Sequence, residues 1–234
     1  MKIDFIIIGA QKSGTTSLSE QLTGHSQICF CKIKEPAYFN TAPDWKAGLN
    51  DYHHLYSPSE GQLCGEASTS YTFLPEYPDT HLRLFEYNPE LKLIYIMRNP
   101  VERIISHYAH RLALNRITES PEDAVFSDSA YLNRSRYSLQ ISPYRALFGK
   151  ENVLLLIFED YIANPYATLK QVANFLNISV EAFETIDDRP RNQSGTKPEF
   201  PRKVKEKLWQ ILEEDFSQIE EILSRRLDVW RSGI

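Results

Sequence analysis

The sequence predicts an α/β fold in three layers, with a central parallel sheet flanked by helices on both faces. Almost wholly apolar runs at residues 4–8, 91–97 and 153–158 have the composition of strands that are buried on both faces. Helical patterns separate these runs, and such alternation is typical of parallel sheets. The chain has 234 residues, 42% hydrophobic and 24% charged, so we expect one domain spanning residues 1–234.

The individual elements follow from short-range patterns. A weaker strand is expected near residues 63–65, between the first two apolar runs. Pro100 suits the first position of a helix, and Gly24 suits the end of one. Apolar residues recur at helical spacing, which predicts helices over 14–23, 101–114, 138–148, 165–176 and from residue 202 onward.

Charge and cysteine content narrow the possible partners. The formal net charge of −5 gives no reason to expect a nucleic-acid partner. No apolar run approaches the roughly 20 residues of a membrane-spanning helix, so we expect no membrane span. The three cysteines fit a reducing compartment better than a disulfide framework, and we expect a cytoplasmic protein.

The segment GAQKSGTTS, residues 9–17, follows the first strand and resembles a phosphate-binding P-loop. A Walker A loop has its lysine directly after the second glycine. Here Thr15 follows Gly14, and the lysine, Lys12, lies inside the loop. Backbone amides at a helix start attract anions, which favours a phosphate or sulfate ligand. A helix cap made by Ser13 or Thr15 is the structural alternative.

The strand at 91–97 ends in Arg98, where a magnesium-dependent P-loop enzyme carries an acidic residue. This predicts an anion site that needs no metal. On the following helix Arg103, Ser106 and His110 share one face. Arg98 and Ser106 could therefore hold a second phosphate, since arginine suits that role. For Arg103, a ligand contact and a surface ion pair are both open.

These two segments resemble the motifs of sulfotransferases that use 3′-phosphoadenosine 5′-phosphosulfate (PAPS). GAQKSGTT resembles their 5′-phosphosulfate loop, and RNPVERIISHY resembles their 3′-phosphate motif. The resemblance covers nearly the whole chain and is closest to the branch that holds heparan sulfate sulfotransferases and many bacterial enzymes. Further matching segments are KEPAYF (34–39), GEASTSY (65–71), SRY (135–137), FEDY (158–161) and the closing IEEILSRRLDVW.

The resemblance implies a P-loop-type fold, PAPS as sulfuryl donor, its desulfated form PAP as product, and no metal. It assigns nucleotide binding to Lys12, Ser13, Gly14, Thr15, Thr16, Arg98, Ser106, Tyr137 and Lys197. Packing against the sheet is the alternative for Tyr137. Lys197 belongs to a turn-rich segment, 191–198, for which a solvated loop is the alternative.

The expected catalytic residues are Lys12, which would neutralise the leaving 5′-phosphate, and Glu35, which would take the acceptor's proton. Glu35 could instead only pair with Lys12 or Lys34, and His53 and His54 are rival bases. Glu66 could be a second acid or part of a buried ion pair. Ala67 stands where the heparan-type pattern has lysine, which puts a polyanionic sugar acceptor in doubt.

The expected function is transfer of a sulfuryl group to a hydroxyl or amine of a small-molecule, glycan or lipid acceptor. Segments 40–60 and 111–135 are the expected acceptor walls, because they are rich in aromatic and charged residues. Two alternatives are a P-loop nucleotide kinase or NTPase, and a nucleotide-binding regulator without turnover. The sequence leaves the acceptor and the oligomeric state open.

Overall fold

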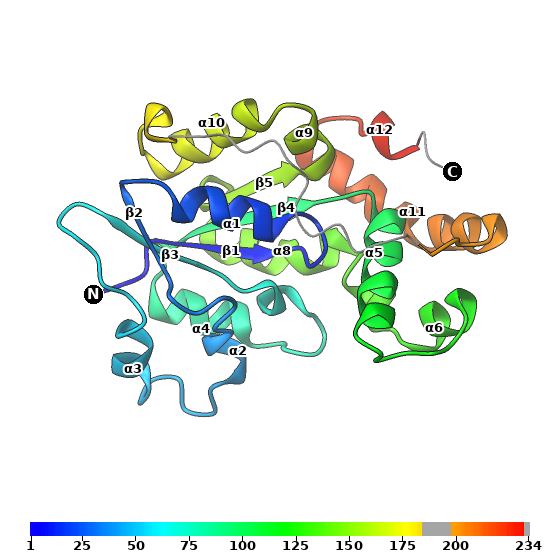
Figure 1. Ribbon diagram of the computed structural model, residues 1–234, viewed down its shortest axis with the longest axis horizontal. Coiled ribbons are helices and arrows are strands. Elements are labelled where there is room, and N and C mark those ends of the chain that lie inside the picture. Colours follow the sequence, from blue (N-terminus) through cyan, green and yellow to red (C-terminus); the bar gives the residue numbers. More distant parts are fainter. Residues whose placement is uncertain (184–197, 232–234) are drawn as a thin grey trace.

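The protein is described by a computed structural model covering residues 1–183 and 198–231. Its core is a five-stranded sheet in which all neighbours are parallel, in the order β2-β3-β1-β4-β5 (Figure 1). The strands are β1 (Phe5–Gly9), β2 (Ile28–Phe30), β3 (Leu63–Ala67), β4 (Lys92–Met97) and β5 (Val153–Ile157). The predicted parallel sheet with helices on both faces is therefore confirmed.

Side chains alternate between the two faces of the sheet, and each face has its own helices. Phe5 and Ile7 of β1 pack with α1 (Thr15–Thr23), α9 (Phe158–Ala163) and α10 (Pro165–Leu176). Ile6 and Ile8 point to the opposite face. That face is covered by α2 (Tyr38–Thr41), α3 (Leu49–His53), α4 (Thr80–Tyr87), α8 (Tyr137–Phe148) and part of α11 (Arg202–Leu223).

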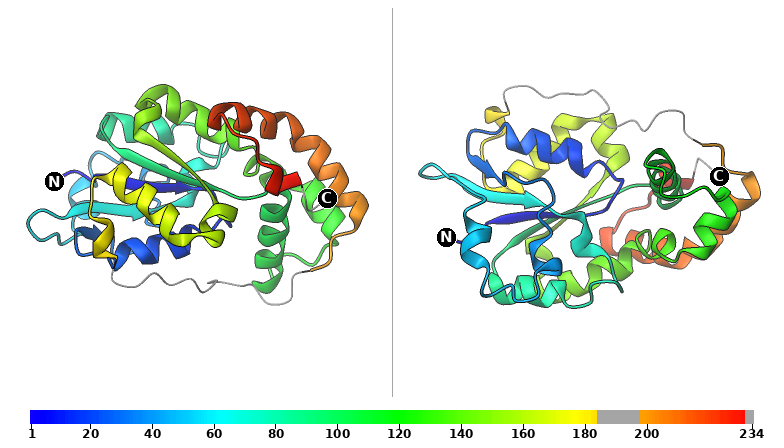
Figure 2. Two further views of the ribbon diagram at one scale, coloured as in Figure 1. Left: turned by 90° about the horizontal axis from the view of Figure 1, so that it is seen from above. Right: turned by 60° about the horizontal axis from the view of Figure 1, so that its bottom comes forward.

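A second body of packed helices extends beyond the end of the sheet (Figures 1 and 2). Helix α5 (Pro100–Ala113) packs there with α6 (Pro121–Ser127), α7 (Ala130–Asn133) and the first half of α11 around a separate apolar core. The short α12 (Asp228–Arg231) returns to the main core through Trp230. Helix α5 thus joins the sheet to this body.

The topology brings the carboxyl ends of β1, β3 and β4 together. The Ser68 amide donates to the Ile7 carbonyl oxygen (3.0 Å), and the Ala10 amide donates to the Ile96 carbonyl oxygen (2.8 Å). Because ligands of open parallel sheets bind at this edge, the loops that leave these three strands form the candidate site.

Candidate active site

The loop between β1 and α1 is built for close approach of a ligand to backbone. Gly14 caps α1 with a φ of 90°, a left-handed conformation that favours glycine. A Cβ at Gly14 would lie 2.6 Å from the Phe158 ring, so the close packing also requires glycine. Lys12 adopts a φ of 69°, which is strained for a residue with a side chain. The loop leads into the amino end of α1, where the helix dipole is positive and attracts anions.

Lys12 is half-buried among other cations. Burial lowers the pKa of its ammonium group, and the nearby charges of Arg98, Lys34 and Arg103 lower that pKa further. The nearby carboxylate of Glu35 raises it. The site therefore concentrates positive charge where an anion could neutralise it.

Arg98 follows β4 directly, as the sequence predicts, and its side chain is 15% exposed. Its guanidinium lies 5.1 Å from the centroid of the Phe158 ring, and Glu102 lies 3.5 Å from Nη2. Arg98 Nη1 also approaches the Lys12 carbonyl oxygen at 3.5 Å. Phe158, from the FEDY segment, thus packs against both Gly14 and Arg98, a role that sequence reasoning missed.

The other predicted nucleotide residues differ in accessibility. Ser13 and Thr15 are buried, whereas Thr16 and Ser106 are half-buried, Ser106 on α5 one turn beyond Arg103. The Tyr137 hydroxyl donates to the Arg98 carbonyl oxygen (2.7 Å), and the ring packs between Tyr95 and Trp230. Tyr137 thus packs under the site, as the alternative for it describes, and its contact with the nucleotide stays a prediction. Lys197 lies outside the described residues.

Arg103 is fully buried and forms no surface ion pair among the described residues, so that expectation is wrong, while the ligand contact stays a prediction. Its Nε donates to Ser135 Oγ (2.5 Å) and its Nη2 to the Tyr131 carbonyl oxygen (2.7 Å). Burial lowers the pKa of Arg103 to about 10, so the group stays charged at neutral pH. Among the described residues its Nη1 has no hydrogen-bond partner, and neither does the buried Ser13 Oγ.

Glu35 lies on the loop after β2, with an exposed side chain and a φ of 53°. Thr69, just after β3, donates its hydroxyl to Glu35 Oε2 (3.0 Å). In the part of the chain that the structure describes, Glu35 forms no ion pair within 4.0 Å, so it is not clamped to Lys12 or Lys34. The carboxylate stays near enough to raise the pKa of Lys12.

Glu66 does not form the buried ion pair considered for it with any residue that the structure describes, and its role as a second acid stays a prediction. It is fully buried on β3, and among the described residues it has no ion-pair partner. The Tyr56 hydroxyl donates to its Oε2 at 3.4 Å. Burial raises the pKa of Glu66 to about 7, although the hydroxyls of Tyr71 and Tyr52 oppose that shift.

The histidines of the candidate site region lie in different parts of the fold. His53 Nε2 contacts the Tyr87 hydroxyl (2.9 Å), which accepts from the Ile3 amide (2.8 Å). His53 and its neighbour His54 therefore lie at the amino end of β1, opposite the loop, and cannot act as base there. His110 lies on α5, where burial lowers its pKa and the nearby charges of Lys12, Arg116 and Lys34 lower it further.

The prediction that segment 40–60 lines the acceptor site is wrong for the aromatic residues of that segment. Trp45, Tyr52 and Tyr56 are buried in the main core rather than exposed to a ligand. In segment 111–135, Arg111 pairs with Asp128, whereas Arg116 is exposed. Aromatic content alone does not distinguish a segment that lines an acceptor site from one that is buried in the hydrophobic core.

The sequence matches the family described as "Sulfotransferase domain" over residues 2–218. The chain belongs to the sulfotransferase family. This match covers nearly the whole chain, as the motifs predicted.

Individual relatives agree with this assignment. Mouse heparan sulfate glucosamine 3-O-sulfotransferase 3A1 is 28% identical over 74% of this chain and 45% of its own length. The chain spans about half or less of the length of such curated relatives. A crystal structure of a sulfotransferase from Alicyclobacillus acidocaldarius superposes with a TM-score of 0.83 at 26% identity, covering 99% of both chains.

The P-loop-type fold is also shared with mouse sulfotransferase SULT7A1 complexed with PAP, at a TM-score of 0.62 and 16% identity, over 99% of this chain and 88% of that one. In residues 1–183 and 198–231, no helix is long and apolar enough to cross a membrane. Within the same residues, no group of three or more His, Cys, Asp or Glu side chains could hold a metal ion.

Proposed function

We propose that residues 1–234 act as one sulfotransferase domain that moves a sulfuryl group from PAPS to a hydroxyl or amine. The observation that carries this proposal is the arrangement of Lys12 among Arg98, Lys34 and Arg103 beside the amide-rich loop. A donor with phosphate groups at two positions would supply further anions to this cluster, in which Glu102 already pairs with Arg98. The unpartnered Ser13 Oγ and Arg103 Nη1 are further polar atoms that fit an anionic ligand.

Each residue then has a chemical role. Arg98 and Ser106 would hold the 3′-phosphate, while the loop amides, Thr15 and Thr16 would hold the 5′-phosphosulfate. Lys12 would neutralise the charge that grows on the leaving 5′-phosphate, which lowers the barrier without a metal. Its lowered pKa still leaves an ammonium group surrounded by cations, and a phosphate is the counter-ion that stabilises it.

Glu35 is proposed as the base that takes the acceptor's proton. The Thr69 hydroxyl holds its Oε2, which leaves the other oxygen free to face an acceptor. Proposed acceptors are small molecules, glycans or lipids with a hydroxyl or amine. The proposed cytoplasmic location is supported by Cys29, Cys31 and Cys64, which are all free thiols.

A binding experiment tests the proposal first. Adenosine 3′,5′-bisphosphate should raise the melting temperature of the protein more than ATP with magnesium does, because the site offers cations for two phosphate positions. A larger shift with ATP and magnesium would instead favour a kinase or NTPase. Screening acceptors with labelled PAPS then tests transfer, and bisphosphate binding without any transfer would favour a regulator.

A further inference from the structure

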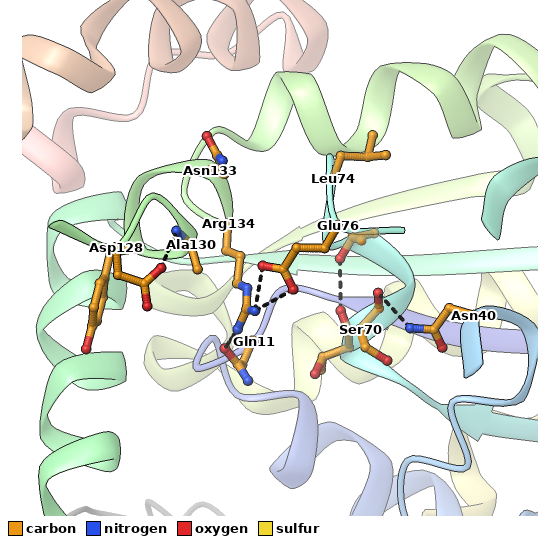
Figure 3. Close-up of polar contacts among 12 residues, drawn as sticks. Gln11, Asn40, Ser70, Leu74, Glu76, Asp128, Ala130, Asn133 and Arg134 are labelled. Atoms are coloured by element: carbon orange, nitrogen blue, oxygen red, sulfur yellow. Dashed lines mark hydrogen bonds and ion pairs between the residues drawn. The ribbon is translucent and has the colours of Figure 1, made fainter. Parts of the chain in front are cut away.

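Arg134 contacts the phosphosulfate loop from a distant part of the chain. It follows α7, and Figure 3 shows its guanidinium between Gln11 and Glu76. Nη1 donates to Gln11 Oε1 at 3.1 Å, and Nη2 donates to the two Glu76 oxygens at 2.8 and 2.9 Å. The guanidinium also lies 3.6 Å from the centroid of the Phe73 ring. Three partners therefore hold a side chain that is only 15% exposed.

Arg134 binds the side chain of Gln11, which directly precedes Lys12 in the loop. A left-handed backbone at a lysine persists only when its surroundings fix it. The contact of Arg98 with the Lys12 carbonyl oxygen, at 3.5 Å, is long for a hydrogen bond. The shorter bond from Arg134 to Gln11 is therefore the firmer external support of this turn.

The segment that carries Arg134 is itself anchored to α5. Arg103 binds the Tyr131 carbonyl oxygen and Ser135 Oγ, and Ser135 Oγ donates to the Pro100 carbonyl oxygen (3.1 Å). The helix that begins beside Arg98 is thus connected through 131–135 to the loop that holds Lys12.

We propose that Arg134 is a positioning residue: through Gln11 it fixes the backbone at Lys12 and so shapes the 5′-phosphate site. This inference rests on the proposed function, because it takes the loop to be the 5′-phosphate site. An arginine suits the role, since its planar fork binds Gln11 and both Glu76 oxygens at once, which a lysine cannot do.

The test compares Arg134→Gln, Gln11→Ala and the double variant, with Arg136→Gln as the matched control. Arg136 lies two positions away, and in the described hydrogen bonds its side chain contacts only the Asn133 side chain. Calorimetry would measure the dissociation constants of adenosine 3′,5′-bisphosphate, 5′-monophosphate and 3′-monophosphate. Melting curves of each variant would show that the fold is kept.

Each single variant should bind the bisphosphate and the 5′-monophosphate about tenfold more weakly, which corresponds to one hydrogen bond to a charged group. The 3′-monophosphate and the control should stay unchanged. The double variant should be no weaker than the single ones, because both remove the same bond. Arg134→Lys should behave like Arg134→Gln.

Three results would overturn the inference: full affinity in Gln11→Ala, recovery by Arg134→Lys, or an equal loss for the 3′-monophosphate. The first two would mean that Arg134 acts by charge alone, and the third that it supports the whole fold. If Arg134→Gln fails to fold, Gln11→Ala alone still decides. Wild-type protein that binds no bisphosphate would refute the proposed function itself, a result distinct from the other three.

Discussion

Replacing Glu66 by glutamine should change how stability depends on pH. Glu66 is a carboxyl group sealed inside the sheet, with hydroxyl groups around it and no ion-pair partner among the described residues. Burial penalises its charged form and raises its pKa from 4.5 to about 7. Glutamine has the same shape but cannot ionise, so the substitution isolates the effect of the charge.

The direction and size of this pH dependence follow from the linkage between proton binding and folding. Between pH 4.5 and 7 the folded protein keeps a proton on Glu66 that the unfolded chain releases. The stability contributed by that proton is complete below pH 4.5 and is lost as pH rises through 7. At about 1.4 kcal/mol per tenfold change in the ionisation constant, the loss is roughly 3 kcal/mol.

Urea unfolding of the wild type and Glu66→Gln at pH 5, 6, 7 and 8 measures this directly. Because part of the loss has already occurred at pH 5, the stability of the wild type relative to the variant should fall by between roughly 2 and 3 kcal/mol from pH 5 to 8. Glu90→Gln, at an exposed glutamate, is the control and should show no such trend. A difference that is constant with pH, or that changes in the opposite direction, would show that Glu66 is ionised in the fold and has an unnoticed counter-charge.

The remaining predictions concern the site and one buried histidine. Lys12→Ala should slow transfer on the order of a hundredfold while changing bisphosphate affinity much less, as rate and calorimetric measurements would show; equal losses would mean that Lys12 only binds. Arg98→Ala should weaken bisphosphate binding by about 2 kcal/mol but spare adenosine 5′-phosphosulfate, which lacks the 3′-phosphate. Glu35→Gln should slow transfer on the order of a hundredfold with donor affinity intact, and normal turnover would exclude it as base. His107 is buried; burial lowers its pKa most, and nearby arginines lower it further, to about 2. The folded state therefore loses stability as pH falls below 6.5, and in acid unfolding experiments the stability of His107→Gln should fall less steeply with pH than that of the wild type.

The central strands and the glycine loop between β1 and α1 could be predicted because their signals are local. Continuous apolar runs mark β1, β4 and β5, and the positions of Gly14 and Arg98 follow from adjacent residues. Strand β2 has only three residues, Ile28–Phe30, too few for a pattern to emerge. Helix α4 went unrecognised too, since its eight residues, Thr80–Tyr87, mix polar and apolar types.

The side-chain environment could not be predicted, because it depends on contacts between distant residues. Arg103 and Ser106 share a helix face in sequence, yet only the structure shows that Arg103 is enclosed by the 131–135 segment. Gln11 and Arg134 are 123 positions apart, and no local pattern links them. The position of Arg134 directly before the SRY motif was the one signal that could have drawn attention to it.

The clustered cations of this site lower the stability of the fold. A bound anion would offset that loss. Lys12 lies near Arg98 and Arg103, and Arg103 is buried without an acidic partner among the described residues. Like charges that are fixed together oppose folding, and a buried guanidinium also loses its hydration. An anion with two phosphate groups would offset both penalties at once, so part of its affinity would come from relieving repulsion that the fold already contains. The segment 131–135, which fixes Arg103 on one side and Gln11 on the other, would then keep these charges in place while the site is empty.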